Sequence, residues 1–288
     1  MTPSRNTARS LCLLAVLFVA GCAPRRHFVA EDWPSADRLF RSDPHWRGGD
    51  GAYSIGLGNG RVLWLFGDSF IKDSGEGGRD GSVMVRNSAA IQEGLNPSTA
   101  RMRFYWGRQG KSPGDFFTAA KGEWLWPGHG TRIGRNLFVF MLRIRAKGDG
   151  VFGFEPFGWT VFLVDNPDEP PTRWIMRRLD SPAGGPGLCS GSVLQWEGHV
   201  YAYCPSEPGH RVYIVRWNAQ DIATGDLSAP LWWAGGQWAG PERAVPAFTQ
   251  GQTELTVHYD ARLRAFVETQ TVEFGASELA LRYAARRG

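Results

Sequence analysis

The stretch GDGAYSIGLGNGRVLWLFGDS, residues 49–69, carries most of the information about the fold. Two runs rich in β-branched and aromatic residues flank a Gly-Asn-Gly segment at 58–60, a pattern typical of a β-hairpin. A three-residue loop over 58–60 would place Asp50 directly opposite Asp68, on the same face of the hairpin. A two-residue turn at 59–60 would instead send the two aspartates to opposite faces, unless a bulge compensates.

The rest of the chain has the same character. Short runs rich in β-branched and aromatic residues recur from about residue 50 onward, each bounded by Gly, Pro, Asn or Asp. A turn followed by an aromatic-rich strand appears at 60–68, 135–142, 198–204 and 263–270, with starts about 60–75 residues apart. This spacing fits four-stranded propeller blades. The sequence therefore predicts an all-β propeller, with a two-sheet sandwich as the alternative fold.

The composition excludes several classes of protein. With 42% hydrophobic and 21% charged residues in 288, the chain can bury a core and is not disordered by composition. Its 37 glycines and 18 prolines exclude a long-helix or coiled-coil protein. The formal net charge of +4 is small for this length, so nucleic acid is not an expected partner. We expect a monomer.

The N-terminal residues indicate export. Residues 1–10 contain two arginines and no acid, and the apolar run LCLLAVLFVA at 11–20 is too short to span a bilayer. The run leads into VAGC at 19–22, which resembles the lipobox of bacterial lipoproteins, whose cysteine becomes the lipidated N-terminus. An ordinary secretory signal with a chance cysteine is the alternative. Ala23 follows Cys22, and the absence of Asp there favours the outer membrane if the host is Gram-negative.

These observations divide the chain into three segments. Residues 1–21 are interpreted as a lipoprotein signal peptide, and residues 22–44 as a lipid-anchored tether and first strand. Residues 45–288 are interpreted as the propeller domain. Cys22 is the predicted site of lipidation, and the protein is expected to be tethered to the membrane through that lipid.

Two cysteines remain in the propeller segment. Cys189 and Cys204 flank two predicted strands joined by a Glu197-Gly198 turn, so a hairpin folded there would bring them nearly opposite each other. An exported protein meets an oxidising environment in which a disulfide persists. A Cys189–Cys204 disulfide is therefore predicted, with two free buried thiols as the alternative. A metal site at these cysteines lacks further ligands.

The first hairpin also resembles a known family. The stretch DGAYSIGLGNGRVLWLFGDSF, residues 50–70, is similar to the opening blade of a bacterial five-bladed propeller family that includes endo-D-arabinanases, with the arabinanase, levansucrase and invertase propellers as broader relatives. The likeness covers roughly residues 45–285. Its further parts are RNSAAI at 86–91, WLWPGHG at 124–130, GSV at 191–193 and TELTVHYD at 253–260.

The resemblance implies a fold and a reaction. In the endo-D-arabinanases the two aspartates of this blade are the catalytic pair of an inverting glycoside hydrolase, and they match Asp50 and Asp68. The implied fold is a five-bladed β-propeller. At the length of these blades, 288 residues less a signal peptide leave a last blade that is expected to be short or incomplete, borrowed from the N-terminal segment, or missing. No cofactor is expected, and structural calcium is left open.

Further residues are candidates for substrate binding. Asn87 and Ser88 could bind sugar hydroxyls, or could satisfy backbone groups of neighbouring strands. Trp126 is the best candidate for stacking on a sugar ring, although most of the tryptophans should pack between blades. His129 stands where the family usually has an acidic residue, which weakens any role transferred to it. Glu254 is an auxiliary acid or substrate-binding candidate, or alternatively caps a turn or forms a salt bridge.

The leading hypothesis is a lipid-anchored glycoside hydrolase that inverts configuration and cleaves an arabinofuranan-like polysaccharide. Its partners would be the polysaccharide and, through Cys22, the membrane. The alternative is a non-catalytic propeller lipoprotein that binds a cell-envelope glycan or a protein. A purely structural envelope lipoprotein is a third possibility. The sequence does not indicate which aspartate would act as acid and which as base.

Overall fold

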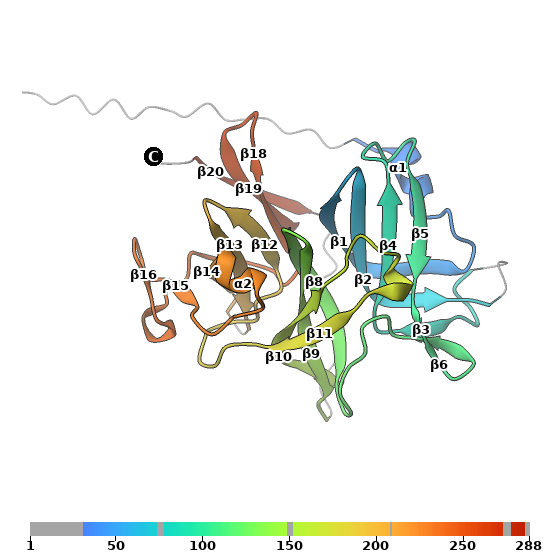
Figure 1. The fold of residues 1–288 in the computed structure, drawn as a ribbon, viewed down its shortest axis with the longest axis horizontal. Coiled ribbons are helices and arrows are strands. Elements are labelled where there is room, and N and C mark those ends of the chain that lie inside the picture. The colour runs from blue at the N-terminus through green and yellow to red at the C-terminus, as the bar shows by residue number, and fades with distance from the viewer. Residues whose placement is uncertain (1–30, 74–77, 149–151, 208, 273–277, 286–288) are drawn as a thin grey trace, which may run out of the picture. The chain divides into compact units, whose positions relative to one another are not determined.

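Antiparallel strands account for nearly all of the regular structure (Figure 1). The first sheet contains β1 (Trp46–Gly58), β2 (Arg61–Ile71), β3 (Val83–Val85), β4 (Ser88–Glu93) and β5 (Arg101–Tyr105). The second contains β8 (Trp124–Ile133), β9 (Asn136–Ala146), β10 (Phe154–Val164) and β11 (Met176–Asp180). The third contains β12 (Ser192–Trp196), β13 (His199–Ser206), β14 (Arg211–Asn218), β15 (Leu231–Trp233), β16 (Trp238–Ala239) and β17 (Phe248–Thr249). The fourth contains β18 (Leu255–Asp260), β19 (Ala265–Thr271) and β20 (Leu279–Ala285).

The remaining elements are short. They are the hairpin of β6 (Gly107–Gln109) and β7 (Ser112–Gly114), the helices α1 (Pro34–Leu39) and α2 (Ala219–Ala223), and two 3₁₀ turns at Pro171–Arg173 and Pro241–Arg243. The computed structural model describes residues 31–73, 78–148, 152–207, 209–272 and 278–285. The predicted signal peptide and Cys22 lie outside these residues. No helix in the described ranges is long and apolar enough to cross a membrane.

The four sheets have the arrangement of propeller blades. The first strand of each sheet contacts the first strand of the next, in the order β1, β8, β12 and β18. The sheets therefore follow one another around a common centre, and the two-sheet sandwich is excluded. The described residues contain four blades, the fourth with three strands, so the five-blade count stays a prediction. In the described part of the segment expected to hold a tether and first strand, the structure has helix α1 instead, and β1 begins at Trp46.

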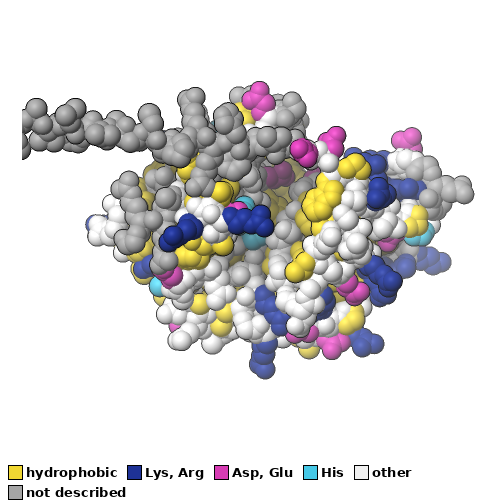
Figure 2. All heavy atoms as spheres, turned by 90° about the horizontal axis from the view of Figure 1, so that it is seen from above, with side chains coloured by type: hydrophobic (Ala, Val, Ile, Leu, Met, Phe, Trp, Pro, Cys, Tyr) yellow, Lys and Arg dark blue, Asp and Glu magenta, His cyan; other side chains and the backbone are white. Residues whose placement is uncertain are grey.

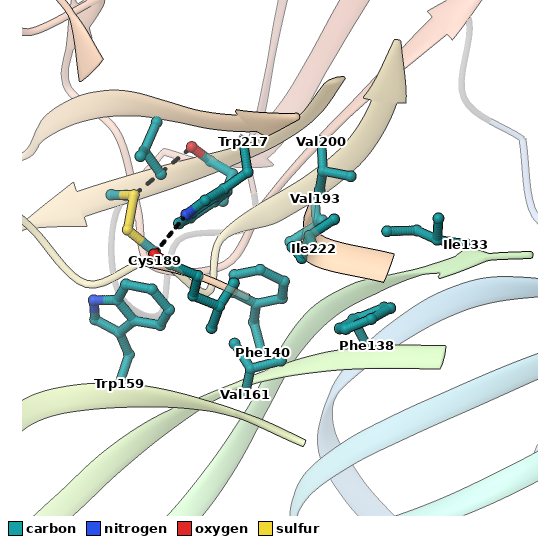
Figure 3. Close-up of a cluster of buried hydrophobic side chains, with 14 of the residues drawn as sticks. Ile133, Phe138, Phe140, Trp159, Val161, Cys189, Val193, Val200, Trp217 and Ile222 are labelled. Atoms are coloured by element: carbon teal, nitrogen blue, oxygen red, sulfur yellow. Dashed lines mark hydrogen bonds between the residues drawn. A yellow bond between two sulfur atoms is a disulfide. The ribbon is translucent and has the colours of Figure 1, made fainter. Parts of the chain in front are cut away.

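The core lies between neighbouring blades and explains why β9 is almost continuously apolar. Leu137, Val139 and Met141 are completely buried against residues of the first blade. Phe138 and Phe140 point to the other face of the same strand and pack with residues of the third blade (Figure 3). Successive residues of a strand face opposite sides, so a strand buried on both faces needs an apolar residue at every position.

A disulfide joins Cys189 and Cys204, with both residues fully buried at the edge of the cluster in Figure 3. Cys189 lies in a turn before β12, whereas Cys204 is within β13. The backbone N–H of Gly191 donates to the carbonyl of Tyr203. The bridge therefore joins β13 to the turn that precedes its neighbour β12, and the two cysteines are not paired in register.

The first hairpin combines both turn geometries considered from the sequence. Gly58 pairs with Arg61, so the turn contains only Asn59 and Gly60, which both have positive φ, 52° and 72°. Positive φ at both positions defines a type I′ turn. Between Gly56 and Gly58 the register shifts by one residue. Beyond this shift the strands pair as they would around a three-residue loop, with Ile55 opposite Leu63. The bulge compensates for the short turn, and the register expected for the three-residue loop is found again at Gly49, which lies opposite Ser69.

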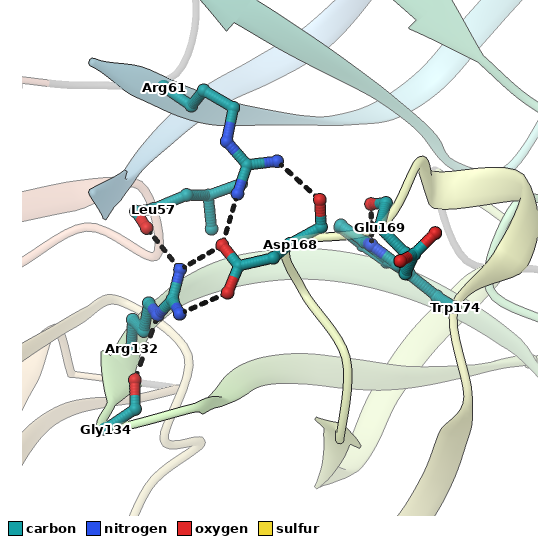
Figure 4. Close-up of polar contacts among 7 residues, drawn as sticks. All are labelled: Leu57, Arg61, Arg132, Gly134, Asp168, Glu169 and Trp174. Carbon is teal, nitrogen blue, oxygen red and sulfur yellow. Dashed lines mark hydrogen bonds and ion pairs between the residues drawn. The ribbon is translucent and has the colours of Figure 1, made fainter. Parts of the chain in front are cut away.

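An ion-pair cluster fixes the turn end of this hairpin (Figure 4). Asp168, from the loop after β10, accepts hydrogen bonds from Arg132 at 2.8 and 2.7 Å and also pairs with Arg61. The hydrogen bond from Arg132 is the main reason why the pKa of Asp168 lies below its usual value. Arg132 also donates to the carbonyl of Leu57. The cluster therefore joins the first and second blades at the end of the hairpin away from Asp50 and Asp68.

Candidate functional site

Asp50 and Asp68 lie at the open end of the β1–β2 hairpin. Gly49 pairs with Ser69 and Gly51 pairs with Phe66, which places Asp50 beside the Gly67–Asp68 segment. A Cβ atom added at Gly67 would lie 3.6 Å from the Cβ of Asp50. The strand is irregular there, because Gly51 and Ala52 both have positive φ, 81° and 105°. For alanine this is an unusual conformation, of the kind that accompanies bulges near functional sites.

The carboxylate of Asp68 is held by two donors. Trp126, on β8, donates its indole N–H to Oδ1 at 2.8 Å, and Arg86 donates from Nη1 to Oδ2 at 3.1 Å. The Arg86 guanidinium in turn lies 4.6 Å from the centre of the Trp124 ring. A charge-assisted bond and an indole N–H fix the orientation of this carboxylate between the first and second blades.

Asp50 and Glu254 form a second part of the site. The pKa of Asp50 is raised, mainly by burial and then by the negative charge of Asp68, while the positive charge of Arg79 opposes the shift. Glu254 directly precedes β18 of the fourth blade, and its pKa is raised by burial and by the charge of Asp50. Both side chains are nevertheless accessible to solvent. They are thus partly desolvated carboxyl groups that a ligand can reach.

Tyr53 connects the first and fourth blades beside Glu254. Its hydroxyl donates to the carbonyl of Thr253 at 3.4 Å, and the ring is 7% exposed. Burial, followed by the charge of Glu254, raises the pKa of the phenol. Tyr53 therefore stays neutral and keeps the start of β18 next to the hairpin that contains Asp50.

His129 holds three blades together and does not offer a free nitrogen to a substrate. Its Nδ1 accepts from the backbone N–H of Val193 at 2.9 Å, and its Nε2 lies 3.0 Å from the carbonyl oxygen of Ser54. This arrangement requires the neutral ring with its proton on Nε2, and burial lowers the pKa in agreement. The sequence-based interpretation of His129 as a substrate-binding residue is replaced by a structural role.

Gly128, which precedes His129, also lies at the contact between the second and third blades. A Cβ atom at Gly128 would lie 2.1 Å from the carbonyl oxygen of Ser190, in the segment that leads into β12. The backbone N–H of His129 donates to that same carbonyl at 3.0 Å. The WPGHG segment therefore allows the second and third blades to approach more closely than any side chain at position 128 would permit.

We expect His129→Ala to destabilise the protein by about 1–2 kcal/mol, because it removes two hydrogen bonds between blades and leaves the N–H of the buried Val193 without its partner. Urea unfolding would measure this loss. His258→Ala is a matched control, since His258 is exposed on β18 and should change stability by less than about 0.5 kcal/mol. Equal stability of the two variants would contradict the structural role of His129.

Asn87 and Ser88 are buried and fully engaged with the protein. The amide of Asn87 donates to the carbonyls of Phe117 and Leu125 and accepts from the N–H of Phe117. Ser88 accepts from the indole of Trp46 at 3.0 Å and also contacts another serine hydroxyl. Both are 0% exposed, so neither can contact a substrate. The prediction that they bind sugar is therefore wrong. The alternative holds, in which their side chains form hydrogen bonds with groups of neighbouring segments.

Three residues that the sequence interpretation left without a role contribute to the site, namely Arg86, Arg79 and Tyr53. Arg86 belongs to the RNSAAI segment noted for its resemblance, and its position directly before Asn87 was the available signal. Arg79 and Tyr53 gave no signal in the sequence, because a lone arginine in a polar loop and a tyrosine in a strand are common. In the described ranges, no three His, Cys, Asp or Glu side chains are grouped as metal ligands.

Comparison with protein families adds to this description. A family model described as a domain of unknown function, DUF5005, matches residues 35–278. The chain belongs to the DUF5005 family. The DUF5005 match begins inside the segment that the sequence assigned to the tether, and it includes every residue of the site described above. The comparison with curated proteins found no match.

Solved structures extend the comparison of this DUF5005 chain. A presumed hydrolase from Bacteroides ovatus has 14% sequence identity and a TM-score of 0.66, over 87% of this chain and 70% of that chain. A GH43_1 enzyme from Xanthomonas citri has 11% identity and a TM-score of 0.44, over 88% and 76%. A Trypanosoma rangeli sialidase has 16% identity and a TM-score of 0.41, over 81% and 36%. At this identity, the likeness to the Bacteroides protein is one of fold.

Proposed function

We propose that this chain is a glycoside hydrolase that cleaves an arabinofuranan-like polysaccharide with inversion, using Asp50 and Asp68 as its catalytic carboxylates. The observation that carries the proposal is the position of both aspartates at the open end of one hairpin, in two different environments. The sequence resemblance to endo-D-arabinanases supports it. The shared fold with a presumed hydrolase is compatible with it.

The different environments of Asp50 and Asp68 support an assignment of one as the general base and the other as the general acid. Asp68 accepts a charge-assisted hydrogen bond from Arg86, as suits an ionised carboxylate that acts as a general base. Asp50 has a raised pKa and, unlike Asp68, accepts no hydrogen bond from an arginine of the described residues, which suits a group that keeps its proton and acts as a general acid. Two carboxyl groups whose environments differ in this way are the usual signature of an acid–base pair.

The proposed reaction needs one water molecule. Asp68 accepts a proton from the water, whose oxygen forms a bond to the anomeric carbon as the glycosidic C–O bond breaks. Asp50 donates its proton to the departing sugar oxygen. The products are a new reducing end of inverted configuration and a shortened glycan, and the two carboxyl groups exchange protonation states with solvent before the next cycle. Glu254, whose pKa is raised by burial and by the charge of Asp50, would bind a sugar hydroxyl.

The charge of Arg79 should affect the pH profile. Arg79 lowers the pKa of Asp50, so Arg79→Gln should raise that pKa and keep the acid protonated to higher pH. We therefore expect the alkaline limb of the kcat/KM profile to move upward in this variant. Arg173→Gln is the control, because Arg173 is an exposed residue after β10 with a weak ion pair. An unchanged or downward-shifted alkaline limb in Arg79→Gln would contradict the assignment of Asp50 as the acid.

Export and lipid anchoring belong to the same proposal. The apolar run at 11–20 and the VAGC segment at 19–22 support a lipoprotein signal and lipidation of Cys22. An outer-membrane lipoprotein would meet extracellular or envelope polysaccharides directly. A buried disulfide within the propeller is compatible with an oxidising compartment.

The test is incubation with D-arabinan, L-arabinan and fructan, followed by measurement of new reducing ends. Release of oligosaccharides from D-arabinan is the expected result. Saturable binding without product, unaffected by loss of both aspartates, would instead favour the non-catalytic glycan-binding alternative. Absence of both product and binding would contradict the proposal altogether.

A further inference from the structure

Aromatic side chains of the second blade form a continuous series that starts at Asp68. Trp126 and Trp124 come from the beginning of β8, Phe154 from the beginning of β10, and Phe152 from the segment just before it. We call these four residues the aromatic strip. All four belong to the end of the blade where β8 and β10 begin, which is also the end that donates the Trp126 hydrogen bond to Asp68.

The rings of the strip are in direct succession. The ring centres of Trp126 and Phe154 are 4.9 Å apart, and those of Phe154 and Phe152 are 5.8 Å apart. Trp124 contacts both Trp126 and Phe154 at 6.3 and 6.0 Å with its ring nearly perpendicular to theirs. The ring planes of Trp126 and Phe154 are also nearly perpendicular, at 87°, whereas those of Phe154 and Phe152 differ by 38°.

The strip becomes more exposed with distance from Asp68. Trp126 and Phe154 are half-buried, and Phe152 is 61% exposed. The Trp126 edge is fixed by its hydrogen bond to Asp68, and Trp124 is backed by the Arg86 guanidinium. The orientation of the rings near Asp68 is thus set before any ligand arrives. A lone exposed Phe is ordinary, but one that continues a series of aromatic rings out of a carboxylate site marks a binding surface.

We infer that the aromatic strip binds consecutive sugar units of a glycan chain whose cleaved bond lies at Asp50 and Asp68. The inference rests on the proposed function and deepens it, because it assigns the path of the polysaccharide over the second blade. The C–H faces of sugar rings pack on aromatic rings, while the sugar hydroxyls stay in contact with water. A protein partner would be expected to need a wider apolar surface than one row of rings.

Phe152→Ala tests the inference, because this ring is exposed and its removal should leave the fold intact. Ile175→Ala is the matched control, since Ile175 is 63% exposed and lies between β10 and β11, away from the strip. The measurements are kcat/KM on D-arabinan and on an aryl arabinofuranoside with a single sugar, and binding of D-arabinan by affinity electrophoresis in the Asp68→Asn background.

We expect Phe152→Ala to weaken D-arabinan binding and to lower kcat/KM on the polymer by roughly three- to tenfold, the value of one aromatic contact. Its kcat/KM on the single-sugar substrate should stay within about twofold of the wild type, and Ile175→Ala should change neither. Equal effects on both substrates, or no effect on polymer binding, would overturn the inference while the wild type still cleaves D-arabinan. A wild type that neither cleaves nor binds D-arabinan would overturn the proposed function and the inference with it.

Discussion

Asp50→Asn and Asp68→Asn should each lower the release of oligosaccharides from D-arabinan by at least about 10²- to 10⁴-fold, the contribution of a general acid or base. Asparagine keeps the size of the side chain but can neither accept a proton from water nor donate one to the leaving oxygen. The loss should appear in kcat and not only in KM, because both groups act on the reacting atoms.

Both variants should remain folded. Asp50 is solvent-accessible, and asparagine at position 68 keeps an amide oxygen that can accept hydrogen bonds from Trp126 and Arg86. Asp180→Asn is a suitable control, because Asp180 is exposed on β11 and far along the blade from the site. Full activity of either variant, with thermal unfolding like that of the control, would show that the aspartate is not catalytic.

Removal of the disulfide should have the largest effect on stability. Cys189 and Cys204 are separated by 15 residues, and closing a loop of this length stabilises a protein by about 3 kcal/mol. For a domain of this size the double variant Cys189→Ala/Cys204→Ala should unfold roughly 6–12 °C lower than the wild type. Alanine avoids placing hydroxyl groups in the apolar surroundings of these residues.

Reducing agent provides the control for this experiment. Dithiothreitol should lower the unfolding temperature of the wild type toward that of the variant and leave the variant unchanged. A thiol titration of denatured, unreduced protein should find neither Cys189 nor Cys204 reactive. Two reactive thiols, or an unfolding temperature that does not respond to reduction, would contradict the contribution of the bridge.

The strands could be predicted because their causes are local. Alternating or continuous apolar residues, with Gly, Asn and Pro between them, determine where a hairpin begins and turns, as in the segment around Asn59-Gly60. The register was open, because the two-residue turn and the adjacent bulge have opposite effects on which face Asp50 occupies. Only the complete backbone shows that both are present.

The partners of the site residues could not be predicted, because they are distant in sequence. Trp126 reaches Asp68 across 58 residues, and His129 receives its hydrogen bond from Val193 across 64. A polar residue in an apolar strand has the same sequence pattern whether it binds a ligand or a buried backbone group. For this reason the sequence predicted that Asn87 binds substrate, and its burial excludes that role.

The stereochemistry of the first product tests the central claim most directly. Proton NMR of D-arabinan during the first minutes of hydrolysis distinguishes the anomer formed by the enzyme from the mixture that later results from mutarotation. An acid–base pair of Asp50 and Asp68 acting on water predicts that the newly formed reducing ends have the anomeric configuration opposite to that of the cleaved linkage. Retention of configuration, or no new reducing ends at all, would contradict it.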